Sequence, residues 1–331
     1  MNAAVLVVLS GLAFGPQSDE VGRTERIRFH SDAWVNLHHF LYQWARAEEG
    51  IGTGRQAVEV PERDDVDRLA PGQHAAWRAA VDFYREHLAA QGHFDSDMLR
   101  IKAALLDATA SGTGAAGALR GVGPPGVGPV LDAAMEVYRT VWWPGHDRAN
   151  RAWIAELLPM AQRFESRYVP LLERSYGGTF DHEVRLDATT YGNWAGGYTS
   201  NRPPHTVVLS TDPRNQGLYG LELIYHEVSH TSPLGRPNVD GVDQAFAALD
   251  AEPPSNLWHA IIFYAAGWTT RGIARDLGLP EHVPYAVNEG LTGFRGWEGL
   301  WPALEEHWAP VLEGRSTREE ALERLARALA G

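Results

Sequence analysis

Apolar residues recur at helical spacing over most of the chain, and they alternate with polar residues in only one short region. Near the start, Trp34, Leu37, Leu41 and Trp44 fall on one face of a helix. The same spacing predicts helices in four further parts of the chain: residues 73–107, 131–175, 217–230 and most of the last hundred residues. The pattern therefore favours a protein built mainly from helices.

The alternating region lies directly before one of these helices. In EVRLDATTY, residues 183–191, Val184, Leu186 and Ala188 alternate with polar residues on one face, and HTVVLS, residues 205–210, follows as a second short strand. Between them NWAGGYTSNRPP, residues 193–204, is rich in turn-forming residues. We therefore expect an α+β fold that is mainly helical, with a small sheet before the helix at 217–230 and a helical C-terminal part.

Composition suggests how the chain is divided. Residues 107–130 are rich in Gly, Ala and Pro, which predicts a flexible loop because these residues interrupt periodic structure. This loop lies within a helical N-terminal part, residues 19–175. The change of pattern after that part marks a second region, residues 176–331, which holds both predicted strands and the C-terminal helices.

The first eighteen residues resemble an export signal. Ala3 to Phe14 is apolar for about a dozen residues, which is the length of a signal-peptide hydrophobic region. The segment before it has no Lys or Arg, and a buried first strand is the alternative. We expect residues 1–18 to be a signal peptide and the protein to be secreted or periplasmic rather than cytoplasmic. No other stretch approaches the ~20 apolar residues of a membrane span, so none is expected.

Charge and cysteine content narrow the chemistry. The formal net charge of the 331 residues is −13, and no Lys/Arg cluster interrupts it. Nucleic-acid binders and binders of anionic membranes carry a basic patch, so both classes are disfavoured. Cysteine is absent, so no disulfide or thiolate site can form, and a bound metal must be held by His, Asp or Glu.

The most informative motif is LELIYHEVSH, residues 221–230. Two histidines four residues apart on a helix lie on one face, about 5–6 Å apart, so His226 and His230 can bind one metal ion. Glu227 stands beside them and can hold and deprotonate a water molecule at the metal. Zinc lowers the pKa of such a water toward neutrality, which gives the HExxH pattern a hydrolytic mechanism.

Residues 183–290 resemble the zincin group of zinc metallopeptidases. In that group a small sheet precedes the HExxH helix and its edge strand holds the peptide substrate in extended form. The metzincin branch continues as HExxHxxGxxH, whereas Pro233 and Arg236 occupy the glycine and third-histidine positions here, and no methionine follows the motif. The resemblance therefore implies a zincin-like core of the gluzincin type, whose third ligand comes from a separate downstream segment.

Two residues compete for the position of third zinc ligand. His259 lies in LWHAIIFYAAG, where an otherwise apolar helix offers one imidazole. Glu289 lies in Asn-Glu-Gly, which resembles the stretch that supplies the glutamate ligand in gluzincin aminopeptidases. In those enzymes the glutamate follows the second histidine of the motif at a shorter spacing than Glu289 follows His230. Because catalytic zinc has three protein ligands, we predict Zn²⁺ bound by His226, His230 and His259, with Glu289 as the main alternative. Three acidic residues are further candidates: Asp240, Asp243 and Glu252.

Supporting groups around such a site are less specific in the sequence. Each ligating histidine needs a partner for its second nitrogen, and carboxylates within residues 240–252 are the nearest candidates. Four side chains near the predicted strands or on the His259 helix could donate to a developing oxyanion: Tyr191, Tyr198, His205 and Tyr264. Aromatic residues of this kind more often fill a core.

The predicted function is that of a zinc-dependent peptidase, a hydrolase in which Glu227 activates water to attack a peptide or protein substrate. One alternative is an exported helical binding or structural protein whose metal site is inert. Another is a glycan-acting protein, because the chain has twelve tryptophans and aromatic rings stack on sugars as readily as they fill cores.

Overall fold

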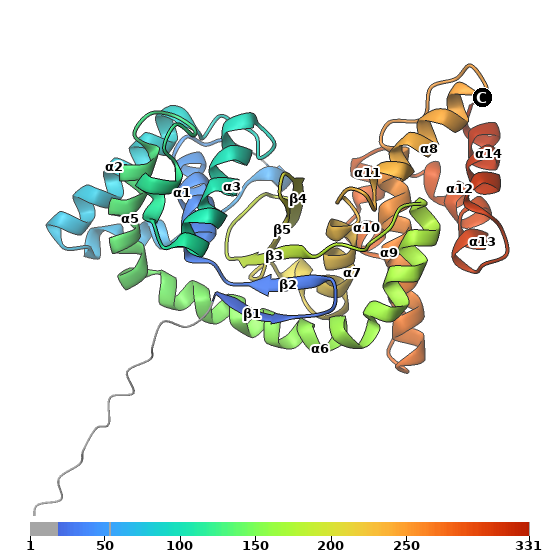
Figure 1. Cartoon of the computed structure of the whole chain (residues 1–331), viewed down its shortest axis with the longest axis horizontal. Coiled ribbons are helices and arrows are strands. Elements are labelled where there is room, and N and C mark those ends of the chain that lie inside the picture. Colours follow the sequence, from blue (N-terminus) through green and yellow to red (C-terminus); the bar gives the residue numbers. More distant parts are fainter. Residues whose placement is uncertain (1–18, 53, 331) are drawn as a thin grey trace, which may run out of the picture.

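The computed structural model describes residues 19–52 and 54–330. Its architecture is α+β and mainly helical, as the sequence predicted, and a five-stranded sheet lies between two groups of helices (Figure 1). Among the described residues, no helix combines the length and the apolar character needed to cross a membrane. The expected signal peptide, residues 1–18, lies outside the described residues.

The sheet has the strand order β1-β2-β3-β5-β4. Its strands are Glu20–Arg23 (β1), Ile27–His30 (β2), Val184–Thr189 (β3), Gly197–Asn201 (β4) and Pro204–Leu209 (β5). Strands β2, β3 and β5 run parallel at the centre, and β1 and β4 close the two edges as antiparallel strands. The predicted strands at 183–191 and 205–210 are thus confirmed as β3 and β5.

Three strands escaped the sequence pattern. Strand β4 lies within residues 193–204, where we predicted only turns, and that prediction was wrong. Its sequence GYTSN shows no apolar alternation because its hydroxyls bond to neighbouring elements, and Thr199 Oγ1 lies 2.9 Å from Thr206 Oγ1 on β5. Strands β1 and β2 have only four residues each, which is too short for a period to be recognised.

Helices α1–α5 form an N-terminal lobe on one side of the sheet (Figure 1). They span Ala33–Glu48 (α1), Pro71–His87 (α2), Ser96–Ser111 (α3), Gly114–Ala118 (α4) and Val127–Val141 (α5). The prediction of a flexible loop over 107–130 was wrong in part, because α3, α4 and α5 all enter that range. Asp132 on α5 accepts hydrogen bonds from the backbone N–H groups of Ala115 and Ala116, which fixes the first turn of α4.

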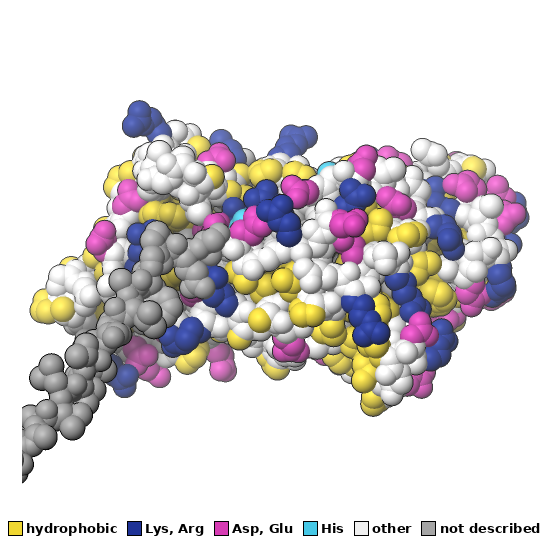
Figure 2. Space-filling model, turned by 60° about the horizontal axis from the view of Figure 1, so that its bottom comes forward, with side chains coloured by type: hydrophobic (Ala, Val, Ile, Leu, Met, Phe, Trp, Pro, Cys, Tyr) yellow, Lys and Arg dark blue, Asp and Glu magenta, His cyan; other side chains and the backbone are white. Residues whose placement is uncertain are grey.

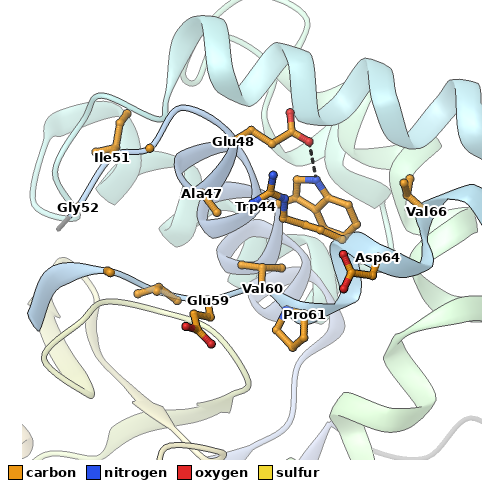
Figure 3. A pocket seen from close by; sticks show the side chains of 14 residues that line it. Trp44, Ala47, Glu48, Ile51, Gly52, Glu59, Val60, Pro61, Asp64 and Val66 are labelled. Atoms are coloured by element: carbon orange, nitrogen blue, oxygen red, sulfur yellow. Dashed lines mark hydrogen bonds between the residues drawn. The ribbon is translucent and has the colours of Figure 1, made fainter. Parts of the chain in front are cut away.

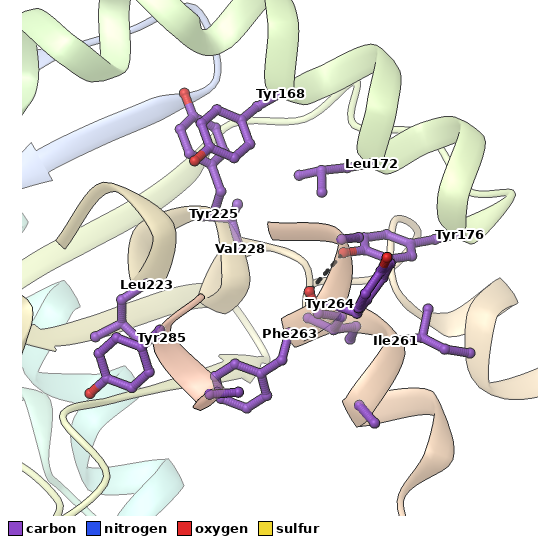
Figure 4. Packing of buried hydrophobic residues seen from close by; sticks show 14 of the residues in the cluster. Tyr168, Leu172, Tyr176, Leu223, Tyr225, Val228, Ile261, Phe263, Tyr264 and Tyr285 are labelled. Atoms are coloured by element: carbon purple, nitrogen blue, oxygen red, sulfur yellow. Dashed lines mark hydrogen bonds between the residues drawn. The ribbon is translucent and has the colours of Figure 1, made fainter. Parts of the chain in front are cut away.

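The remaining helices and the sheet form a larger C-terminal lobe. They span Trp143–Tyr176 (α6), Gly217–Val228 (α7), Arg236–Ala247 (α8), Leu257–Asp276 (α9), Tyr285–Asn288 (α10), Leu291–Phe294 (α11), Leu300–His307 (α12), Ala309–Leu312 (α13) and Arg318–Leu329 (α14). Helix α7 packs between α6 and α9, as Figure 4 shows from the side of the buried aromatic residues. The ring of Tyr225 on α7 stacks on that of Tyr168 on α6, with centroids 3.8 Å apart.

The alternation along the central strands explains how one sheet serves two lobes. Val184, Leu186 and Ala188 on β3 point into the larger core together with α6, α7 and α9. Val207 on β5 points the other way and packs against Val35 on α1 in a small separate cluster. Because successive side chains of a strand face opposite sides, both faces of the sheet are buried.

A buried ionic cluster joins the two lobes on the face of the sheet that carries Val207. Arg185 on β3 donates from Nε to Asp187 at 2.7 Å and from Nη2 to Asp32 at 2.8 Å. Asp32 caps α1 by accepting from the backbone N–H groups of Trp34 and Val35. Although burial alone would raise it, Arg185 and a 2.7 Å hydrogen bond from His205 hold the pKa of Asp187 well below its usual value.

The outer surface carries both signs of charge side by side. On the face shown in Figure 2, Lys and Arg side chains are interspersed with Asp and Glu, and neither sign gathers into one large patch. This face therefore shows no large positively charged patch of the kind that attracts a nucleic acid.

We expect Arg185→Met to reduce the free energy of unfolding by about 3–5 kcal/mol, because it leaves two buried carboxylates without their cation. Urea unfolding at neutral pH measures this loss. The matched control is Arg327→Met, because Arg327 is 66% exposed on α14, and its effect should stay within about 0.5 kcal/mol. A loss below about 1 kcal/mol for Arg185→Met, the value of an exposed ion pair, would contradict the bridging role.

Candidate metal centre

Helix α7 presents the first two residues of the motif at the base of a cleft. His226 and Glu227 lie in its last turn, and the helix ends at Val228, so His230 lies in the turn that follows. The backbone N–H of His230 donates to the carbonyl of Glu227 at 3.0 Å, which keeps the chain coiled beyond the helix end. Both histidines therefore face the same side although the helix is shorter than expected.

Helix α9 brings His259 to the same point. Nε2 of His226 lies 3.2 Å from Nε2 of His230 and 3.3 Å from Nε2 of His259. One ring nitrogen from each of the three side chains can be chosen so that all lie within 4.8 Å of one another. Two ligands of a tetrahedral zinc at 2.0–2.1 Å are about 3.3 Å apart, so the three nitrogens fit such an ion.

Aromatic rings fix the orientation of the three imidazoles. The ring of His226 stacks on Phe263 at 3.6 Å between centroids, and Trp258 stacks on His259 at 5.0 Å. Trp258 also meets His230 edge-on at 5.7 Å. Because each imidazole packs against a ring, the convergence of their nitrogens does not depend on mobile side chains.

Burial keeps these histidines uncharged. It lowers the pKa of His230 to about 4, and the nearby Arg295 adds to this effect. The pKa values of His226 and His259 lie well below the ordinary value, first because of burial and then because of their neighbours. Since a metal binds the neutral form of imidazole, all three are in the protonation state that coordination requires at neutral pH.

Glu227 sits between this cluster and the edge strand. Thr199 Oγ1 on β4 lies 2.9 Å from Glu227 Oε2 and 2.8 Å from the Glu227 carbonyl oxygen, and its one hydroxyl hydrogen is shared between these two acceptors. Burial raises the pKa of Glu227 to about 7, against the opposing effect of the Thr199 hydrogen bond. A Cβ atom at Gly197 would lie 3.2 Å from Glu227 Cγ, so a glycine at this position lets β4 approach the helix closely.

The other proposed ligands are not brought to this point. Among the described residues, His226, His230 and His259 form the single group of three side chains with metal-binding geometry. Glu289 lies at the end of α10 and accepts a hydrogen bond from the side chain of its neighbour Asn288. Asp240 pairs with Arg236 at 2.7 Å, while the two remaining acidic candidates are exposed: Asp243 and Glu252.

The expected carboxylate partners for the second imidazole nitrogens are absent from the described residues. No hydrogen bond joins residues 240–252 to the three histidines, and Nδ1 of His226 is buried without a partner. Nδ1 of His259 instead lies 3.4 Å from Nη1 of Arg295, in the turn after α11. Arg295 was not singled out in the sequence, because a lone arginine in a short loop carries no pattern.

A cleft of about 740 Å³ opens above the site and is lined by both lobes. Tyr42, His93 and Phe94 contribute from the N-terminal lobe, and Trp194 and Tyr198 come from the edge-strand region. The histidine cluster and Arg295 form the opposite wall. The three imidazoles therefore lie in the wall of a cleft that both lobes line.

Of the four suggested oxyanion donors, only Tyr198 lines this cleft. Its hydroxyl lies 2.7 Å from Nε2 of His39. His205 is buried against Asp187 beneath the sheet, and Tyr264 donates to Glu305 away from the cleft. Tyr191 bonds to Glu62 in the N-terminal lobe.

Lys102 on α3 is a second residue that the sequence did not reveal. It is buried, its Nζ lies 4.2 Å above the ring of Tyr198, and it has no hydrogen-bond partner among the described residues. Burial lowers the pKa of Lys102 to about 7, although the nearby Asp187 and Glu227 oppose the shift. The edge strand thus lies between a cation on one side and Glu227 on the other.

A separate pocket in the N-terminal lobe has no comparable chemistry. It is lined by Trp44, Glu48, Val60 and residues of the loop that follows α1, and Trp44 Nε1 donates to Glu48 Oε1 at 3.0 Å (Figure 3). None of the described residues around it belongs to a group with metal-binding geometry. We therefore assign the candidate chemistry to the cleft between the lobes.

Comparison of the chain with protein-family models, with curated proteins and with solved structures finds no match in any of the three. The zincin resemblance therefore stays a prediction that depends on the motif and on the geometry of this site.

We expect the purified protein to hold about one zinc per chain and to lose it to a chelator. His259→Ala should lower the zinc content strongly, because it removes one of the three converging nitrogens. Glu289→Ala is the matched control and should retain the metal. Elemental analysis after dialysis measures both, and retention of zinc by His259→Ala together with loss by Glu289→Ala would reverse the ligand assignment.

The depressed pKa of Lys102 predicts a pH-dependent effect on stability. The charged form is disfavoured in the folded state, so the native protein has its full stability above the unfolded pKa of Lys, near 10.4, and loses part of it as the pH falls toward 7. Lys102→Met should therefore stabilise the protein at pH 7 by about 2–4 kcal/mol, and the gain should shrink as the pH rises toward 10. Urea unfolding at several pH values measures this, and a gain that stays constant with pH would contradict it.

Proposed function

We propose that this protein is a zinc-dependent peptidase. The observation that carries the proposal is the convergence of three neutral imidazoles beside a buried glutamate in a cleft, with Nε2 of His226 3.2 and 3.3 Å from the Nε2 atoms of the other two. His226, His230 and His259 would hold the ion, and three protein ligands, rather than four, are the pattern of catalytic zinc sites.

The chemistry divides between the metal and Glu227. When bound, zinc supplies Lewis-acid chemistry that makes water a stronger acid near neutral pH. Glu227 is adjacent in sequence to His226, and its carboxylate accepts a proton from the attacking water and then donates it to the amine that leaves. Thr199 positions this carboxylate by the hydrogen bond at 2.9 Å.

The edge strand offers a way to hold the substrate. Strand β4 is the last strand of the sheet, and it lines the cleft. The Leu209 N–H donates to the Gly196 carbonyl at 2.9 Å, and hydrogen-bonded pairs alternate along an antiparallel ladder. The backbone groups of Thr199 therefore face the open edge, where an extended peptide can add as a further strand, whereas the outward-facing carbonyl of Gly197 accepts from Asn193 Nδ2 at 2.9 Å.

One observation favours a second candidate, a binding protein with an inert metal site. Nδ1 of His226 has no partner among the described residues, and ligating histidines with no partner for the second nitrogen bind metal less tightly. A glycan-acting protein is less well supported, because no tryptophan is among the exposed large hydrophobic residues described. Twelve tryptophans thus do not form an exposed stacking platform.

Glu227→Gln tests the catalytic role directly. It should keep the zinc and reduce peptide hydrolysis by about a hundredfold to ten-thousandfold, because it removes the group that transfers the proton. Fragment profiles of a mixed peptide library, digested with and without chelator, measure the activity. Glu306→Gln, on an exposed side chain of α12, is the control and should behave as wild type. Cleavage by Glu227→Gln at the wild-type rate would refute the mechanism.

A further inference from the structure

Arg295 is placed in the cleft without an acceptor for most of its hydrogen-bonding groups. Its Nε is buried with no partner, and it forms no salt bridge with any described residue. Its guanidinium lies 5.1 Å from the ring centroid of Trp297, which supports it from one side. A guanidinium has five N–H donors in a planar fork, and a buried donor without an acceptor is costly.

The one hydrogen bond that the Arg295 side chain makes with a described residue is lost once His259 acts as a ligand. Nε2 of His259 faces the other imidazoles, so its Nδ1 carries the hydrogen in the metal-binding tautomer. The nitrogen that lies 3.4 Å from Arg295 Nη1 is then a donor, and two donors face one another. In that tautomer, no described residue offers an acceptor to the fork of Arg295.

The charges that line the cleft point to the sign of that acceptor. Its charged lining consists of four arginines and one glutamate, although the chain as a whole has a net charge of −13. Arg214 is paired with Asp212 and Arg236 with Asp240, while Arg46 donates to the backbone carbonyl of Ala89 at 2.8 Å. Arg295 lacks such a partner, and it stands beside the metal ligand His259.

We propose that Arg295 binds a substrate carboxylate next to the bond that is cleaved. The proposal rests on the proposed peptidase function and adds a substrate class to it. The planar fork of arginine matches the two oxygens of a carboxylate. That carboxylate is either the C-terminus of the peptide, which makes the enzyme a carboxypeptidase, or an Asp or Glu side chain beside the cleaved bond.

Binding measurements on the full chain test this assignment without relying on turnover. Zinc-loaded Glu227→Gln protein is titrated calorimetrically with two pairs of peptides of one sequence. The first pair compares a free C-terminus with a C-terminal amide. The second pair has amidated ends and compares Glu with Gln in one position. The pair that shows a preference identifies which source of carboxylate is bound.

We expect the carboxylate member of one pair to bind about tenfold or more tightly than its neutral partner. Adding Arg295→Met should remove this preference and leave the affinity for the neutral peptide unchanged. Arg295→Lys should keep only part of it, because an ammonium cannot bind both oxygens as a planar fork, and this variant replaces Arg295→Met if the latter unfolds. Arg327→Met is the matched control and should keep the full preference.

The results separate this assignment from the peptidase proposal. A preference that persists in Arg295→Met, or no preference in either pair, overturns the role of Arg295. If wild-type protein hydrolyses peptides without such a preference, only the role of Arg295 fails. If the preference depends on Arg295 but wild-type protein hydrolyses none of the peptides, the carboxylate site stands and the peptidase function fails.

Discussion

The packing of α7 against α9 is the constraint on which the site depends. Phe263 and His259 are four residues apart on α9, so both face α7. Phe263 stacks on His226 at 3.6 Å between ring centroids, and one turn away His259 brings its Nε2 to 3.3 Å from the same imidazole. One apolar contact therefore fixes the distance between two helices and the convergence of three nitrogens. A histidine on an apolar helix usually forms its hydrogen bonds within the core. Here the packing of α9 instead directs the ring of His259 toward His226 and His230.

The edge strand β4 contacts both lobes and so fixes their relative position at the site. Its side chains alternate, so Tyr198 faces Lys102 and His39 of the N-terminal lobe while Thr199 faces Glu227. Strand β4 can lie close to α7 because Gly197 has no side chain that would meet Glu227. The N-terminal lobe is thus more than a separate helical domain, since it supports the strand from behind and supplies one wall of the cleft.

The sequence predicts the regular parts of this molecule better than its site. Long periodic segments revealed the helices, and HExxH revealed His226, Glu227 and His230, because a short local pattern keeps its residues together even though His230 lies in the turn just after α7. Strand β4 escaped because an edge strand of polar residues shows no alternation. Arg295 and Lys102 escaped because single residues from distant segments meet only through tertiary packing. His259 could be favoured but not chosen over Glu289, since sequence spacing does not determine which downstream helix packs against the motif.

The charged side chains around Glu227 are not explained by the stability of the fold. Lys102 and Arg295 both lie near the carboxylate, yet neither forms a salt bridge with a described residue. A buried cation without a partner destabilises a fold, and Lys102 lies against an aromatic ring, where a methionine would pack as well. Lys102 and Arg295, two basic side chains without a salt bridge beside the buried Glu227, therefore do not stabilise the core. Perturbed charges of this kind cluster at functional sites, and here they lie beside the edge strand and the histidine cluster, where we propose that the substrate binds.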